Sequence, residues 1–148
     1  MPGEASEIAG PNARDPATTA TRIEDGWYSY AIVRIVPRVD RGESLNAGII
    51  LFARTLGFLE ARLALDEARL RALAPGLDIE QVKAHLESFR LIAAGDLAGG
   101  PIASMSASER FHWLTSPRST IIQTSPIHIG RCDDPETTIE ELMGRLVR

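Results

Sequence analysis

The residue types best suited to polar chemistry are concentrated in one charged segment, Arg38-Val-Asp-Arg-Gly-Glu-Ser-Leu-Asn-Ala-Gly48. A guanidinium group that a carboxylate holds in place can bind a phosphate or another carboxylate through two parallel hydrogen bonds. Glu43 could orient Arg34 or Arg41 in this way, and Asn46 could add an amide at the same place. The segment therefore predicts a site for a small ligand that carries a phosphate or a carboxylate.

The same residues also have a purely structural interpretation, and their chemistry leaves the two interpretations open. An exposed pair between Arg41 and Glu43 in a hairpin loop would contribute less than ~1 kcal/mol to stability. Gly48 would then mark only a bulge in a strand. If the site is catalytic, Glu43 is the only reasonable general base, on the condition that burial raises its pKa.

A second candidate is the segment Ser116-Pro-Arg-Ser-Thr120. The hydroxyl groups of Ser116 and Ser119 flank Arg118 and could hold an anion together with backbone donors. If this segment pairs with the first strand, Arg118 and Glu43 could face one cleft. The alternative is a proline turn with ordinary bonds from hydroxyl to backbone, and the residue types favour that alternative.

The sequence contains no motif for metal binding or for nucleotide binding. The three histidines, His85, His112 and His128, are too far apart in sequence to form a familiar metal-binding pair. Neither of the two glycine-rich phosphate-binding motifs, the P-loop and G-x-G-x-x-G, is present in the sequence. We therefore predict no metal site and no cofactor. The net charge is −4, so nothing draws the whole chain toward nucleic acid.

Three expected strands surround the first candidate site. Residues 27–36 are aromatic and β-branched almost without a break, residues 45–52 are an apolar run, and polar and apolar residues alternate in 58–64; turns separate the three segments. Two helices that begin after Asp66 and Asp78 should cover one face of this antiparallel meander. One or two later strands, within 119–123 and 125–130, should extend the sheet, and an amphipathic helix follows Asp134-Pro135. The fold class is α+β.

The organisation of the chain is expected to be simple. Residues 1–26 lack periodicity and are predicted to form a flexible tail, and residues 27–148 are predicted to form one domain. The single cysteine, Cys132, cannot form an internal disulfide. No apolar run reaches the ~18 residues of a membrane span, and no secretion signal is recognisable. We therefore expect a cytoplasmic protein.

Three motifs taken in order resemble a known bacterial family. They are YSYAIVRIVPRVDRGESLNAGIILF, ALDEARLRALAP and ERFHWLTSPRSTIIQTSPIHIGRCDDPE, and together they span about residues 27–147. The resemblance is to domain of unknown function 3037, a family without an assigned activity. It implies an accessory role, because we associate such proteins with genes beside kinase-like proteins of the HipA type.

These observations favour a binding module over an enzyme. The first hypothesis is an accessory domain that binds a protein partner, with a HipA-like kinase as the candidate. The second is a small enzyme or sensor whose anionic ligand binds at Arg34, Arg41, Glu43, Asn46 and Arg118. A weaker hypothesis is nucleic-acid binding through four arginines, namely Arg34, Arg38, Arg41 and Arg118.

Overall fold

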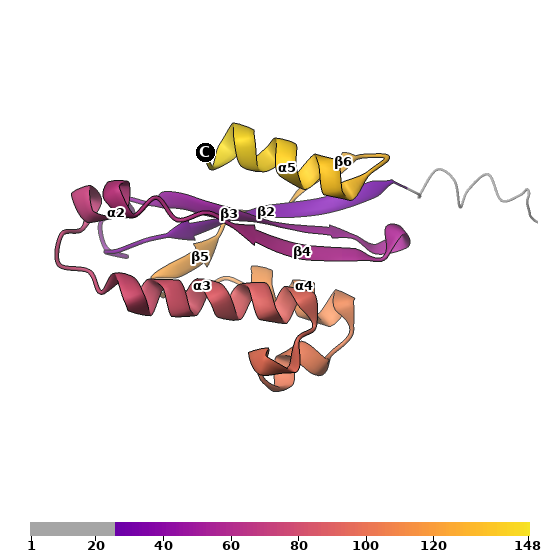
Figure 1. Cartoon of the computed structure of the whole chain (residues 1–148), viewed down its shortest axis with the longest axis horizontal. Helices are drawn as coiled ribbons and strands as arrows, with labels where there is room; N and C mark the ends of the chain where they lie inside the picture. Colours follow the sequence, from indigo (N-terminus) through magenta and orange to yellow (C-terminus); the bar gives the residue numbers. More distant parts are fainter. Residues whose placement is uncertain (1–25) are drawn as a thin grey trace, which may run out of the picture.

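A five-stranded antiparallel sheet lies at the centre of the molecule (Figure 1). The computed structural model describes residues 26–148, so the predicted tail lies outside the described residues except for Gly26. The strands are β2 (Trp27–Ile35), β3 (Leu45–Ala53), β4 (Phe58–Leu63), β5 (Ile122–Thr124) and β6 (His128–Arg131). The order is β4-β3-β2-β5, and β6 also pairs with β2. The predicted α+β fold, a meander extended by two later strands, is confirmed.

Seven helical segments lie within residues 26–148, and three of them follow directly after the predicted capping residues. The seven segments are η1 (Arg54–Leu56), α2 (Glu67–Leu73), α3 (Ile79–Ala94), η2 (Leu97–Gly99), η3 (Pro101–Ser104), α4 (Ala107–Thr115) and α5 (Pro135–Leu146). Asp66, Asp78 and Asp134 each accept a hydrogen bond from a backbone N–H in the first turn of the following helix. Within residues 26–148, none of these helices combines the length and the apolar character that a membrane span requires.

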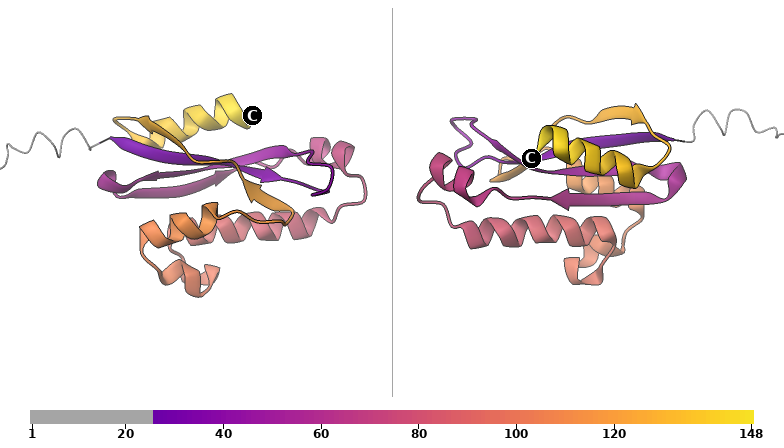
Figure 2. Two further views of the ribbon diagram at one scale, coloured as in Figure 1. Left: turned by 180° about the vertical axis from the view of Figure 1, so that it is seen from behind. Right: turned by 45° about the horizontal axis from the view of Figure 1, so that its top comes forward.

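Helices cover both faces of the sheet, whereas the sequence led us to expect one covered face. Figures 1 and 2 show α3 and α4 against one face and α5 against the opposite face. Two separate clusters of buried side chains result. The physical reason is that β2 is apolar on both sides, so Val33 and Ile35 need cover on one face and Ile32 needs cover on the other.

Two irregularities determine how the strands meet around β2. The register of β2 and β3 shifts between Val33 and Arg34. Nearby, a Cβ atom at Gly48 would lie 2.5 Å from a methyl group of Leu63 and 2.6 Å from the carbonyl oxygen of Arg62. Only glycine therefore allows β4 to approach β3 here, and Gly48 lies next to the register shift that its interpretation as a bulge led us to expect.

On its other side β2 pairs with two different strands. β5 pairs with Val33 to Ile35, and β6 pairs with Trp27 to Tyr30. Between these two pairings the buried Ser125 completes the ladder: its hydroxyl oxygen accepts a hydrogen bond of 2.8 Å from the backbone N–H of Ile32. A side chain thus replaces a strand residue where the chain changes from β5 to β6.

Candidate functional site

The charged loop between β2 and β3 forms two internal ion pairs. Arg38 donates to Asp40 at 2.7 and 3.3 Å, and Arg41 donates to Glu43 at 2.9 Å through two hydrogen bonds. All four side chains are at least half exposed, and the predicted pair between Arg41 and Glu43 is confirmed. Exposed pairs of this kind contribute little to stability.

The loop borders a hollow of about 460 Å³ beside the turn between α2 and α3. Its lining includes Arg38, Arg41 and Glu43 on one side and the segment from Leu73 to Leu77 on the other. Both guanidinium groups face carboxylates of their own loop, so their charge is already compensated. An incoming anion would have to compete with Asp40 and Glu43 for the same donors.

The electrostatics of Glu43 do not favour a general base. The guanidinium of Arg41 hydrogen-bonds to the carboxylate and attracts it, and this lowers the pKa of Glu43. The same pairing raises the pKa of Arg41. The raised pKa that catalysis would need depends on burial, but the Glu43 side chain is 50% exposed. The structure therefore gives Glu43 a stable negative charge.

Arg34 and Asn46 lie elsewhere, on the face of the sheet that α5 covers. They are register partners across β2 and β3. The Asn46 amide donates a hydrogen bond of 2.9 Å to the carbonyl oxygen of Leu146, the last residue of α5. Asn46 thus satisfies one of the free carbonyl groups at the end of that helix. The structure gives Asn46 a role in attaching α5 to the sheet.

Arg118 is placed at a third location, where it closes the end of α4. Its guanidinium donates to the carbonyl oxygens of Trp113, Leu114 and Ser116, and it lies 4.5 Å from the ring centre of Trp113. Burial lowers the pKa of Arg118. The expected common cleft with Glu43 is not formed, because Arg118 does not line the hollow beside the charged loop.

The hydroxyl groups near Arg118 follow the structural interpretation. The Ser116 hydroxyl donates to the carbonyl oxygen of His112 at 2.7 Å, and the Thr120 hydroxyl donates to that of Ile122 at 3.0 Å. Ser119 is exposed in the loop that leads to β5. This segment is a proline turn with ordinary bonds from hydroxyl to backbone. The sequence candidates are thus divided among three places.

A different hollow was missed from the sequence. It measures about 530 Å³ and is lined by Trp27, Tyr28, Ser29, Phe52, Arg54, Thr55, Ser108 and Ile129. Trp27 is 43% exposed and Ile129 is 70% exposed, although both are large and apolar. Arg131 lies 5.3 Å from the ring centre of Trp27. The sequence predicted Trp27 only as the first residue of an aromatic and β-branched strand. The polar Ser29, two residues along on the same face of β2, was a signal that this face is less apolar at the beginning of the strand.

Comparison with known proteins identifies the family. The model of the family described as protein of unknown function DUF3037 matches residues 30–147, which is most of the chain. Searches among curated proteins and among solved structures found no match. The chain therefore belongs to the DUF3037 family of proteins of unknown function.

Proposed function

We propose that this protein is a non-catalytic accessory module that binds a protein partner through the hollow around Trp27 and Ile129, here called the tryptophan surface. The observation that carries the proposal is the exposure of these two large apolar side chains beside one cavity. Interfaces between proteins are organised around such anchors, and Trp is the residue type most enriched among those that dominate binding energy.

The rim of the tryptophan surface indicates the chemistry of the partner. Arg54 lines the hollow, and the guanidinium of Arg131 lies against Trp27. A matching segment would insert an apolar side chain beside Phe52 and carry acidic residues that face the two arginines. The first partner to test is the HipA-like kinase that the family resemblance implies.

This proposal is preferred to a site for a small anionic ligand because of how the polar residues are distributed. Arg38, Arg41 and Glu43 share one hollow, but Asn46 and Arg118 contact carbonyl groups at the ends of two helices. A catalytic or ligand-binding set has to converge on one point. A surface for a partner needs only an anchor and a compatible rim.

The experiment begins with purification of the tagged protein from its host at native level, with and without nuclease, followed by mass spectrometry. The identified partner is then purified, and its affinity is measured by calorimetry. We expect Trp27→Ala or Ile129→Thr to weaken binding at least tenfold, about 1.4 kcal/mol. Leu97→Ser is the matched control, because Leu97 is 74% exposed and does not line the hollow.

Two results would contradict the proposal. One is that no other protein is purified together with the tagged protein in a comparable amount. The other is an unchanged affinity in both variants while their melting temperatures stay at the wild-type value. A complex that disappears on nuclease treatment would point to nucleic acid, and its affinity should then fall steeply with added salt.

A further inference from the structure

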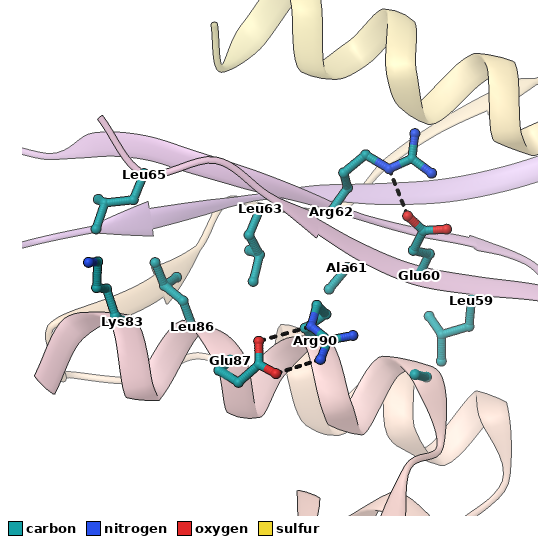
Figure 3. Close-up of a pocket in the computed structure, with 11 residues that line it drawn as sticks. Leu59, Glu60, Ala61, Arg62, Leu63, Leu65, Lys83, Leu86, Glu87 and Arg90 are labelled. Carbon is teal, nitrogen blue, oxygen red and sulfur yellow. Dashed lines mark hydrogen bonds and ion pairs between the residues drawn. The ribbon is translucent and has the colours of Figure 1, made fainter. Parts of the chain in front are cut away.

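One edge of the sheet is open in the part of the chain that the structure describes. β4 pairs with β3 on one side, and no strand within residues 26–148 pairs with it on the other. An unpaired edge presents a row of N–H and C=O groups to any strand that can approach. Beside this edge, between β4 and α3, lies a groove of about 580 Å³ (Figure 3).

The backbone groups that face outward can be identified from the ladder. The N–H of Ala64 donates to the carbonyl oxygen of Ala47 on β3. In an antiparallel pair such contacts recur at every second residue, so Arg62 and Glu60 also bond to β3. The N–H and C=O groups of the alternate residues therefore point to the open edge, and these residues are Leu59, Ala61 and Leu63.

The sequence of this edge, Leu59-Glu-Ala-Arg-Leu63, is complementary to itself when reversed. If a second copy pairs antiparallel about Ala61, each Leu59 lies opposite a Leu63 and each Glu60 lies opposite an Arg62. Ala61 faces itself through its outward backbone groups, which is where a twofold axis can pass. Oppositely charged residues across a strand pair are stabilising.

The charges also exclude the neighbouring registers. When the pairing shifts so that its centre is Glu60 or Arg62, that residue lies opposite its own copy, and like charges directly opposite destabilise a strand pair. The centre at Ala61 is the arrangement that aligns opposite charges and keeps the outward backbone groups paired. Charged residues often protect an edge from pairing, but here they select one partner and one register.

The groove below the edge suits the same partner. Its lining includes the aliphatic side chains of Leu59, Leu63 and Leu65, and the ion pair between Glu87 and Arg90 lies along its α3 side (Figure 3). Leu59, Leu63 and Leu65 are only partly buried. A second copy would place its own edge leucines against them and remove this apolar surface from water.

We propose that the open edge of β4 is a dimer interface, in which two copies of this chain pair antiparallel about Ala61 and form one continuous ten-stranded sheet. This surface is distinct from the tryptophan surface, so the two proposals can fail independently. The dimer would carry two partner-binding surfaces.

The test is sedimentation velocity on the full chain across a concentration range, combined with hydrogen exchange resolved by residue. The wild type should sediment as a species of twice 16.1 kDa. Glu60→Lys places like charges opposite each other and should give a monomer. Glu136→Lys is the matched control, since it also removes a carboxylate partner of Arg62 but lies on α5, and it should remain dimeric.

Hydrogen exchange examines directly whether the outward backbone groups of β4 are paired. In the wild type the amides of Leu59, Ala61 and Leu63 should be protected from exchange. In Glu60→Lys these three amides should exchange at least tenfold faster, whereas the amides at positions 60 and 62 should stay protected because they bond to β3. The proposal is overturned if the wild type is monomeric at every concentration, or if Glu60→Lys dimerises as strongly as wild type. A monomer with protected outward amides would show that another segment of the same chain covers β4, and it would overturn the proposal too.

Discussion

At the scale of single residues, several polar side chains that suggest chemistry instead complete the backbone. Ser125 is the clearest example, because it is 3% exposed and its hydroxyl accepts from Ile32 and donates to the carbonyl oxygen of Pro126. Arg118 satisfies carbonyl groups at the end of α4. Arg110 does the same for α3, where it donates to Ile92 and Ala93. Buried or half-buried polar groups are retained here because the backbone groups they contact would otherwise lack partners.

Replacement of Ser125 tests this role at one residue. Ser125→Ala leaves the buried N–H of Ile32 without its acceptor, so the free energy of unfolding should fall by about 1–3 kcal/mol. Urea unfolding followed by circular dichroism measures the change. Ser119→Ala, at an exposed serine of the same region, should change it by less than ~0.5 kcal/mol. Equal effects of the two substitutions would show that the Ser125 hydrogen bond is unimportant.

At the scale of secondary-structure elements, α5 is attached to the sheet by polar contacts at both ends of its inner surface. Asn46 binds the carbonyl oxygen of Leu146 at its end, and Arg62 pairs with Glu136 and Glu140 in its earlier turns. Between them Ile139, Leu142 and Met143 are almost fully buried. The apolar stripe supplies most of the attraction, and the polar contacts determine the direction in which α5 crosses the strands.

Two residues of the charged segment should therefore differ in their effect on α5. Asn46→Ala removes the contact at the end of the helix and should lower the free energy of unfolding by about 0.5–1.5 kcal/mol. The amides of the last turn of α5 should then exchange faster with solvent. Glu43→Ala removes only an exposed pair and should change stability by less than ~0.5 kcal/mol. A larger loss in Glu43→Ala than in Asn46→Ala would contradict this assignment.

At the scale of the whole molecule, the ionised carboxylates contribute a stability that depends on pH. Hydrogen bonds and charges from basic partners lower the pKa of Glu43, Glu67, Glu87 and Glu140, and the capping contacts of Ser106 lower that of Glu109. A carboxylate whose pKa is lower in the folded state stabilises the protein above its unfolded pKa of about 4.3. That contribution is lost as the pH falls through the folded pKa.

The melting temperature should consequently stay high near neutral pH and fall as the pH drops below about 4.3. Glu140→Gln removes one contributing carboxylate, so this variant should lose less stability between pH 7 and pH 3 than the wild type. Glu141→Gln is a suitable control, because Glu141 is exposed and forms no ion pair with another residue of 26–148. Scanning calorimetry across this range provides the measurement. Identical pH profiles for Glu140→Gln and wild type would contradict the expectation.

Short patterns in the sequence were enough to predict the local structure. The capping aspartates and the apolar strands separated by turns are signals that act over a few neighbouring residues, and the structure agrees with each of them. The α+β class and the family followed from the same information. These features were predictable because their interactions form between residues that are close along the chain.

Contacts between residues far apart in the sequence arise from the packing of the whole chain. Asn46 and Leu146 are 100 positions apart, and Ile32 and Ser125 are 93 positions apart, so no local pattern indicates these contacts. The cover of both sheet faces, the division of the expected polar site among three places and the exposure of Trp27 depend on how α4, α5 and β6 pack around β2. Packing decides them because burial of apolar area is non-directional, and side chains with several potential partners bind those that the packed elements bring within reach.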